Sequence, residues 1–383
     1  MNMIILQTIW VLTNRAVPHG GFTTAVLYRL STTHFAHTHP SLYASSSGPG
    51  ASPTPIAMQL TFLRRTSAGP ALLRVEDTKL GARTSTIHVT LSQPDSGSRG
   101  GGNYSSSVKV AGYITLSAAN AESGPSVPMD WYLHPPPPPG SRPDGSVDLA
   151  ALGATGRDGA WARASPAFLE FRRAAVHVEV FGPDPQSSSS SSSSSFSSSS
   201  PGSDMDHGMG MEEFGRRGIT DQWARFWPSG EKGRWTNEAV AFLVDMFPMT
   251  LDNLDRMASE TLSSSSSEDN DEDEQRFNHS NSKKARFWYP TVTLNVEFKK
   301  RLPPGGVEWL YSRVHSKVLR DGRTDLDVVV LDERGEVVAL SNQVALVVSA
   351  SRNVDGRAAA ASRAAGAVSS SSALVLRRRG ARL

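Results

Sequence analysis

A helix followed by four alternating strands occurs twice in this 383-residue chain, and this repeat constrains the fold more than any other feature. The first copy predicts a helix over 19–35 and strands over 56–65, 70–81, 84–93 and 108–117. The second copy predicts an opening strand over 174–181, a helix over 236–254 and strands over 291–300, 307–319, 324–333 and 336–350. Apolar and polar residues alternate in these strands, as Met58, Leu60 and Phe62 illustrate, which is the period of a strand buried on one face. A duplicated unit of this kind predicts an α+β fold.

The second of these helices is apolar on nearly every side over residues 238–247, so it should be buried rather than lie on a surface. A sheet that wraps around a buried helix is the layout of the hot-dog fold. The sequence therefore predicts a double hot-dog, in which two antiparallel sheets each wrap a long central helix.

Low-complexity tracts separate and interrupt the two copies. Residues 135–139 are consecutive prolines, residues 187–200 are serines apart from Phe196, and residues 263–267 are serines followed by an acidic run. Such tracts cannot bury a core, so they are typical of linkers and disordered inserts. We expect an N-terminal hot-dog domain over 16–118, a Pro-rich linker over 119–165, a C-terminal hot-dog domain over 166–353, disordered inserts near 184–218 and 261–284, and a disordered tail over 354–383.

Composition excludes several classes of protein. The chain has no cysteine, which rules out thiol nucleophiles, disulfides and Cys-ligated zinc. Its formal net charge is only +2, without a basic stripe in the patterned regions, so we expect no nucleic-acid partner. No apolar run reaches about 18 residues, so we expect no integral membrane segment. A G-x-S-x-G elbow, a Walker loop and a G-x-G-x-x-G fingerprint are all missing, which argues against serine hydrolases of the α/β type and nucleotide-binding folds.

Six segments carry a resemblance to a known family. They are VPHGG (17–21), LTFLRRTSAGPA (60–71), KLGARTSTIHVTLSQ (79–93), WYLHPPPPP (131–139), FWYPTVTLN (287–295) and ALSNQVALVVSASRN (339–353). In this order they resemble fungal thioesterase-like proteins of the acyl-CoA thioesterase II group, which are double hot-dogs. The resemblance covers residues 16–353 apart from the low-complexity tracts. Residues 1–15 depart from it, so either the N-terminal domain lacks its first strand or the gene model is wrong at that end.

The resemblance implies an activity and a set of catalytic residues. The activity is hydrolysis of acyl-CoA thioesters to a free carboxylic acid and coenzyme A, with no metal and no cofactor, because coenzyme A is part of the substrate. The FLVD, YPT and ALSNQ segments place the catalytic residues at Asp245, Thr291 and Gln343. Asp245 would act on a water molecule that Thr291 and Gln343 help to hold. The alternative is a non-catalytic acyl-CoA or acyl-carrier-binding protein of the same fold.

The residues themselves leave the role of Asp245 open. It stands among apolar neighbours, and an ionised carboxylate in such surroundings costs several kcal/mol unless it is paired or hydrogen-bonded. Catalysis is one reason to retain such a group, and an ion pair with a basic side chain is the structural alternative. Thr291 and Gln343 carry little signal alone, since a Thr that starts a strand is usually a strand former.

Substrate contacts follow from the same reading. The acyl chain is expected beside the second helix near Phe242 and Phe247, and Lys299 and Lys300 are expected to meet the coenzyme A phosphates unless they form a solvated strand end. A hot-dog dehydratase is a further rival, but its chemistry resembles a His plus carboxylate arrangement, and the predicted second helix contains no His.

Three histidines, His34, His37 and His39, form an H-x-x-H-x-H cluster that metal ligands can share. No carboxylate is nearby in the sequence, so a solvated helix end is the favoured interpretation. The chain ends in Ala381-Arg382-Leu383, which resembles the S-K-L peroxisomal tripeptide, with coincidence in an Arg-rich tail as the alternative. We therefore expect a cytoplasmic or peroxisomal protein, and we expect it to form a homo-oligomer.

Overall fold

A computed structural model describes residues 3–6, 13–14, 17–42, 53–94, 106–184, 218–265 and 285–351. The serine tract, most of the second predicted insert and the predicted tail with its C-terminal tripeptide lie outside these residues, and the expectations for them stay predictions. Among the described helices, none is long and apolar enough to cross a membrane.

The strands form one large antiparallel sheet. Their order across it is β1 (Met3–Leu6), β5 (Ala71–Lys79), β6 (Ser85–Pro94), β7 (Ser106–Ser117), β4 (Thr54–Phe62), β13 (Thr291–Phe298), β17 (Val337–Leu346), β16 (Arg323–Leu331), β14 (Trp309–His315), β11 (Ile219–Phe226), β10 (Val178–Pro183), β9 (Trp161–Arg163) and β8 (Arg157–Asp158), with β15 (Leu319–Arg320) beside β16. Two short ribbons lie apart from it, β2 (Thr13–Asn14) with β3 (Val17–Pro18) and β12 (Phe287–Trp288) with β18 (Val348–Ser349). The eight repeat strands expected from apolar alternation, four in each copy, are thereby confirmed.

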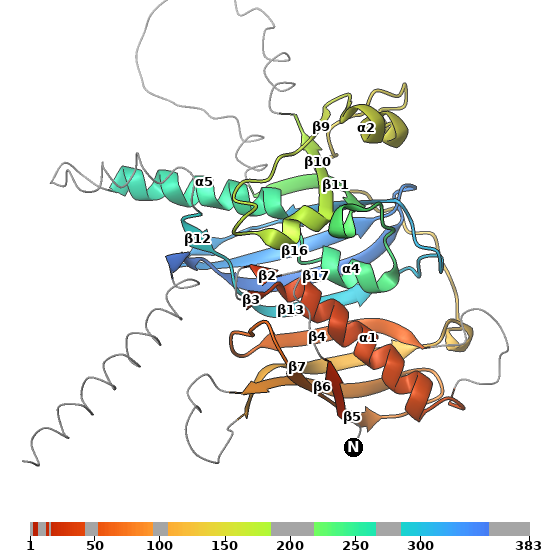
Figure 1. The fold of residues 1–383 in the computed structure, drawn as a ribbon. Coiled ribbons are helices and arrows are strands. Elements are labelled where there is room, and N and C mark those ends of the chain that lie inside the picture. Colours follow the sequence, from red (N-terminus) through yellow and green to blue (C-terminus); the bar gives the residue numbers. More distant parts are fainter. Residues whose placement is uncertain are drawn as a thin grey trace, which may run out of the picture.

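The sheet has two halves with the same internal order. β1-β5-β6-β7-β4 in the first half corresponds to β11-β14-β16-β17-β13 in the second, and β4 pairs with β13 where the halves meet. At this junction Leu60 lies opposite Leu294, and Met58 lies opposite Val296. The double hot-dog fold is confirmed, but its two predicted sheets are continuous with each other (Figure 1).

The outer strands of the two halves differ from the prediction. Residues 3–6 form β1 and pair with β5, so a strand occupies the outer edge of the first half. The predicted opening strand of the second half overlaps β10 only over 178–181, because 173–177 form a short 3-10 helix, and β11 takes the position equivalent to β1. The sequence hides β11 because Asp221 and Gln222 put two buried polar residues into it, which breaks the apolar alternation. Arg313 and Tyr311 on β14 hydrogen-bond to the Asp221 carboxylate and compensate its burial.

The helices α1, α4 and α5 lie on one side of the sheet (Figure 1). α1 (Gly20–Thr38) packs on the first half, and its apolar residues join those of β4 to β7 in one core. The continuous helix predicted over 236–254 is wrong, because the chain forms α4 (Asn237–Leu243) and then α5 (Pro248–Ser265). Proline has no N–H to continue the hydrogen bonding of a helix, so α5 starts afresh at Pro248. α5 also runs to residue 265, into the stretch expected to be a disordered insert.

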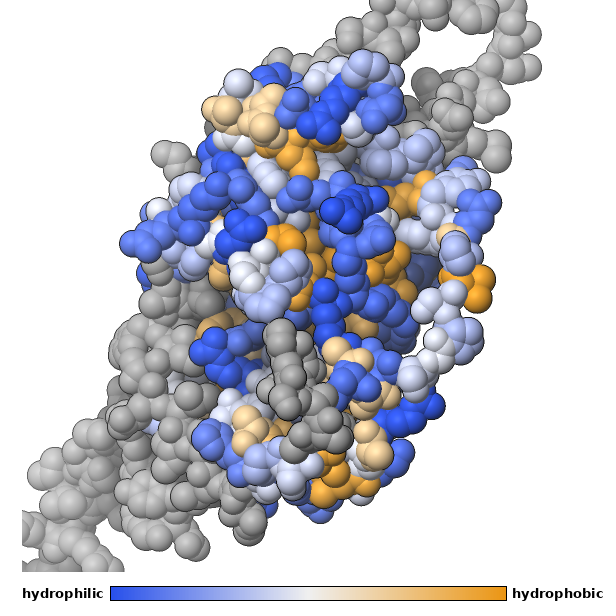
Figure 2. Space-filling view, turned by 90° about the vertical axis from the view of Figure 1, so that its right-hand side faces the viewer, coloured by the Kyte–Doolittle hydropathy of each residue, from blue (hydrophilic) through white to orange (hydrophobic). Residues whose placement is uncertain are grey.

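α1 and α4 contact each other across the junction of the two halves. Gly21 makes this possible, because a Cβ atom there would lie 2.5 Å from the backbone oxygen of Phe242. The second core forms under α4 and unites its residues Val240 and Leu243 with the strands of the second half. On the face seen in Figure 2, hydrophilic side chains predominate and apolar ones form separate patches, as expected when the large apolar residues are buried.

The predicted Pro-rich linker is partly structured. Its last residues form α2 (Leu149–Thr155), β8 and β9, which extend the sheet of the second half. Its proline run is attached to that half by hydrogen bonds from Trp161 Nε1 to the oxygen of Pro138 at 2.9 Å, from Arg313 Nη1 to the oxygen of Pro135 at 2.5 Å and from the Ala160 N–H to the oxygen of Pro139 at 3.1 Å.

Candidate active site

A cavity of about 260 Å³ opens between the two halves, next to the start of α1. All three residues expected to be catalytic, Asp245, Thr291 and Gln343, line it. They come from the bend between α4 and α5, from the first residue of β13 and from the middle of β17. The first half contributes the chain that enters α1, at His19 and Gly20.

The Asp245 carboxylate is fixed by hydrogen bonds from both halves. The Gly21 N–H donates to Oδ2 at 2.6 Å, and Thr291 Oγ1 donates to Oδ1 at 3.1 Å. The side chain of Asp245 is only 6% exposed. Gly21 lies at the N-terminus of a 19-residue helix, where N–H groups lack intrahelical acceptors and the helix dipole favours negative charge. The buried carboxylate thus has partners that stabilise its ionised form.

The bend after α4 aims Asp245 into the cavity. Beyond Leu243 two backbone hydrogen bonds span three residues instead of the four of an α-helix. They run from the Asp245 N–H to the Phe242 oxygen at 3.3 Å and from the Met246 N–H to the Leu243 oxygen at 2.8 Å. Gln343 holds this bend, because its Nε2 donates to the Val244 oxygen at 2.6 Å. Its Oε1 is buried and has no hydrogen-bond partner among the residues that the structure describes. Gln343 therefore offers a buried acceptor rather than direct contact with Asp245.

His19 is a site residue that the sequence reading missed. It caps α1, with Nδ1 accepting from the Gly21 N–H at 3.2 Å, and the same Nδ1 lies 3.5 Å from Asp245 Oδ2. Within the described part of the chain, no Lys or Arg forms an ion pair with Asp245. The expected structural partner for Asp245 is therefore missing there. VPHGG contained the signal, since a capping residue before two glycines marks a helix start that another group can approach closely.

Burial has the largest effect on the pKa values of Asp245 and His19. It raises the pKa of Asp245, against the opposing effects of His19, the Gly21 N–H and Thr291. It lowers the pKa of His19, which the neighbouring Asp245 opposes. The ring of His19 is accordingly neutral near pH 7, where an unperturbed His is already mostly neutral.

The raised pKa of Asp245 predicts how stability depends on pH. A carboxyl group whose pKa is higher in the folded than in the unfolded state stabilises the fold while it is protonated, and this contribution is lost as pH rises through the folded pKa. The melting temperature of the wild type should therefore fall relative to Asp245→Asn as pH increases from about 4. Thermal denaturation of both proteins over a pH series measures the difference. A constant difference at every pH would contradict the raised pKa.

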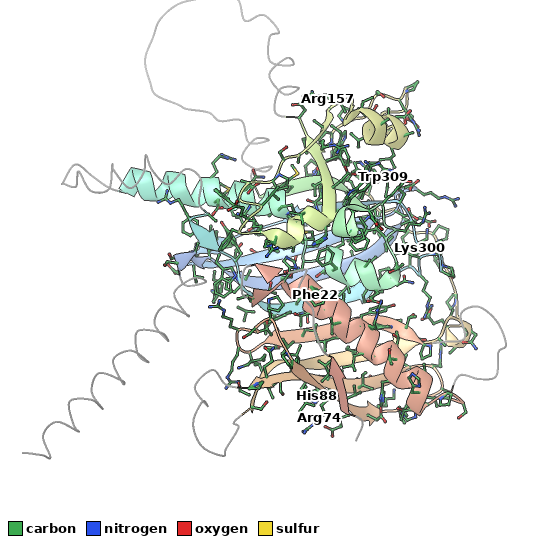
Figure 3. The ribbon with its side chains drawn as sticks, in the orientation of Figure 1. Phe22, Arg74, His88, Arg157, Lys300 and Trp309 are labelled. Carbon is green, nitrogen blue, oxygen red and sulfur yellow. The ribbon has the colours of Figure 1, made fainter. Side chains whose placement is uncertain are left out.

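Of the four expected substrate contacts, one lies in the cavity. Phe247 lines it, whereas Phe242 is buried in the core of the second half with its ring 5.6 Å from that of His19. Lys299 and Lys300 do not line it, so their predicted contact with coenzyme A phosphates is not supported. Lys299 pairs with a neighbouring glutamate and Lys300 with two carboxylates in the turn between β16 and β17. In Figure 3 Lys300 lies on the right-hand side of the molecule, apart from Phe22 at the start of α1.

A different basic pair lines the cavity. Arg64 and Arg65 follow β4 in the first half, one residue further from the strand end than Lys299 and Lys300 are from the end of β13. Both are exposed. Arg64 Nη1 donates to the Val108 oxygen at 3.0 Å, and the guanidinium of Arg65 lies 5.8 Å from the centre of the Trp288 ring. The cavity therefore has positive charge at its exposed rim. Each basic pair ends the same strand of its half, and only packing brings the first pair to the cavity.

The remaining lining of the cavity is largely apolar. Side chains from α5, from the bend before it and from the segment that follows the linker form one wall, and those from β16 and β17 another; they include Phe171, Phe247, Leu251, Leu254, Leu326, Ala345 and Leu346. Arg172 also lies in this wall, but it is buried and paired with Asp252 and Asp255. An apolar wall beside a buried polar group is typical of a site for a ligand with a hydrocarbon part.

Two families of known protein domains match the two halves of the chain. The acyl-CoA thioesterase N-terminal domain family matches residues 10–117, and the acyl-CoA thioesterase C-terminal domain family matches residues 179–347. A thioesterase-like protein of Talaromyces wortmannii, TwmA, is 31% identical over 349 residues, which is 88% of this chain and 86% of that protein.

Two solved structures share the fold. One is a hot-dog protein of unknown function from Alicyclobacillus acidocaldarius, with 16% identity, a TM-score of 0.50 and coverage of 91% of this chain and 93% of that one. The other is a thioesterase candidate from Novosphingobium aromaticivorans, with 14% identity, a TM-score of 0.52 and coverage of 90% and 94%. At these identities the likeness concerns the fold alone. With one family domain matched in each half and a relative above 30% identity across most of its length, the chain belongs to the acyl-CoA thioesterase family.

Proposed function

We propose that this cavity hydrolyses acyl-CoA thioesters and that Asp245 activates the attacking water. The observation that carries the proposal is a buried carboxylate, held by the N-terminus of α1 and by Thr291, in a cavity with an apolar wall and a cationic rim. Asp245 would take a proton from water while the water oxygen attacks the thioester carbonyl carbon. The tetrahedral intermediate would then expel the coenzyme A thiolate, which recovers the proton. General base catalysis of this kind contributes roughly 10²–10⁴ in rate.

The neighbouring groups have distinct parts in this proposal. Thr291 keeps one oxygen of Asp245 oriented, and the free buried Oε1 of Gln343 would accept a hydrogen bond from the same water. The start of α1 reaches the cavity at Gly20, so its N–H groups and helix dipole are suited to the negative charge that develops on the thioester oxygen. The first half thus supplies charge stabilisation and the second half supplies the base.

Coenzyme A release from a series of substrates, from acetyl-CoA to long-chain acyl-CoA, tests the activity. Release that saturates with at least one chain length is expected. Tight acyl-CoA binding without release at any chain length would favour the non-catalytic acyl-CoA-binding alternative.

Dehydration of 3-hydroxyacyl thioesters is a second candidate, because His19 and Asp245 form the His plus carboxylate pair that the second helix alone does not provide. In that reaction His19 would remove the proton from the carbon next to the carbonyl. Asp245 would protonate the leaving hydroxyl to give water and an enoyl thioester. One contact favours hydrolysis: Nδ1 of His19 already accepts from the Gly21 N–H, so the basic nitrogen of the neutral ring is occupied and is not turned toward a substrate. Mass spectrometry of the products from a 3-hydroxyacyl-CoA separates loss of water from loss of coenzyme A.

The two basic pairs give a matched test of where coenzyme A lies. We propose that its phosphates meet Arg64 and Arg65 rather than Lys299 and Lys300. The double variant Arg64→Ser/Arg65→Ser should raise KM for acyl-CoA about tenfold and change kcat little, since contacts with the phosphates persist from ground state to transition state. Lys299→Ser/Lys300→Ser is the matched control and should leave KM unchanged.

An acyl-pantetheine thioester, which lacks the phosphates, makes this test specific. Its KM should be nearly the same in both double variants and the wild type. If Arg64→Ser/Arg65→Ser raises KM equally for both substrates, the pair acts on the shape of the cavity and does not bind phosphate.

A further inference from the structure

A second cluster of reactive side chains lies at the opposite end of α1 from the cavity. Two of its members come from the histidine cluster, His34 in the last turns of the helix and His39 at its C-cap, and the third is Asp77 on β5. Asp77 is distant from these histidines in the sequence. The packing of α1 on the sheet brings its carboxylate next to them. A 19-residue helix is about 28 Å long, so this cluster is separate from the catalytic cavity.

The donor atoms of the cluster converge on one point. His34 Nε2 lies 2.7 Å from Asp77 Oδ1, and His39 Nε2 lies 2.9 Å from Asp77 Oδ2. The ligand atoms of all three residues lie within 4.8 Å of one another. Two ligands of a tetrahedral zinc ion, each about 2.1 Å from the metal, are about 3.4 Å apart. Rotations that move these atoms by less than about 1 Å would therefore admit such an ion.

The surroundings support a bound ion rather than only a shared proton. The side chain of His34 is 6% exposed and anchors the cluster, while those of His39 and Asp77 are 19% and 31% exposed and leave a path to solvent. Thr38 Oγ1 lies 3.4 Å from His34 Nδ1, which engages that nitrogen and leaves Nε2 for a ligand bond. The pairing of β5 with β6 shifts register between Asp77 and Lys79, an irregularity of the kind that redirects a side chain.

We propose that His34, His39 and Asp77 bind a divalent transition-metal ion, with zinc as the best match, and that water completes its coordination. Two imidazole nitrogens and one carboxylate suit zinc, whereas magnesium and calcium prefer oxygen ligands alone. The ion crosslinks the C-terminal end of α1 to β5. This proposal is independent of the reaction at the cavity.

Isothermal titration of ZnCl₂ into full-length protein that has been stripped with EDTA and dialysed tests the site. We expect one zinc ion per chain and a rise in melting temperature of about 5 °C at a hundredfold excess over Kd. His39→Asn and Asp77→Asn should each weaken binding about 100-fold. The matched control is His37→Asn, since His37 is exposed on the same helix and stands outside the cluster, and it should bind zinc like the wild type.

Two outcomes would overturn the proposal. One is wild-type protein that takes up no zinc at micromolar concentrations. The other is zinc binding that survives unchanged in both His39→Asn and Asp77→Asn, which would locate the ion elsewhere. In either case the cluster is a hydrogen-bonded ion pair that ties α1 to β5. The binding titration decides between these outcomes even if a variant lowers the melting temperature.

Discussion

Asp245→Asn should lower turnover by about 100-fold or more while the protein stays folded. Asparagine has nearly the shape of aspartate: its amide oxygen can accept from the Gly21 N–H and its amide nitrogen can donate to Thr291 Oγ1, but it cannot take a proton from water. Substrate KM should change little, because the lost interaction acts mainly in the transition state. The melting temperature should hold or rise near neutral pH, since the variant removes a charge that burial disfavours. Turnover and melting temperature are to be measured on the same preparation.

Asp221→Asn provides the matched control for a structural carboxylate. Asp221 is also buried, but Arg313 and Tyr311 bind it and it does not line the cavity. Removing its charge leaves Arg313 without its carboxylate partner, so the melting temperature should fall while turnover per folded molecule stays at the wild-type value. A well-folded Asp245→Asn protein with wild-type turnover would remove Asp245 from the mechanism.

Combined variants test whether the three expected catalytic residues act on one water molecule. Thr291→Val and Gln343→Ala should each reduce turnover less than Asp245→Asn does. Adding either of them to Asp245→Asn should have little further effect, since groups that act as a unit are strongly non-additive. Full multiplicative effects would mean that the residues act in separate steps.

Gly20→Ala should reduce turnover about 100-fold and leave the melting temperature almost unchanged. The new Cβ atom would stand 2.6 Å from Asp245 Oδ2 and 3.5 Å from Thr291 Oγ1, so the carboxylate must move away from its partners. A displacement of about 1 Å at a reacting group can cost 10²-fold in rate. The helix itself tolerates alanine well. Steady-state kinetics and thermal denaturation on the same protein measure the two effects.

Gly21→Ala and Gly305→Ala give the contrast that this prediction needs. At Gly21 the added Cβ would meet the backbone oxygen of Phe242 at 2.5 Å, and backbone cannot rotate away, so this variant should lose about 1–3 kcal/mol of folding free energy. At Gly305 no heavy atom lies within 4 Å of the added Cβ, so activity and stability should both be unchanged. Wild-type turnover in Gly20→Ala would show that the start of α1 does not position the carboxylate.

Local sequence pattern determined most of the secondary structure. Apolar alternation located eight strands of the sheet because buried apolar residues recur at every second position in most of them, most regularly in β6. The same rule failed for β11, where the consecutive residues Asp221 and Gln222 point to opposite faces of the strand and are both buried, with partners elsewhere in the fold. It also extended the second helix across Pro248, because apolar content over 238–247 continues past the point where hydrogen bonding ends.

The residues expected to be catalytic were found through the resemblance, but the site they form is a product of tertiary structure. Asp245 accepts from Gly21, which is 224 residues away in the chain, and it lies beside His19. These contacts depend on how closely α1 packs against α4, and a local pattern contains no information about which helices meet. The basic pairs after β4 and β13 look equivalent in sequence, yet only Arg64 and Arg65 reach the cavity. Sequence pattern records which face of each element is buried, whereas the contacts between distant elements decide which side chains share a site.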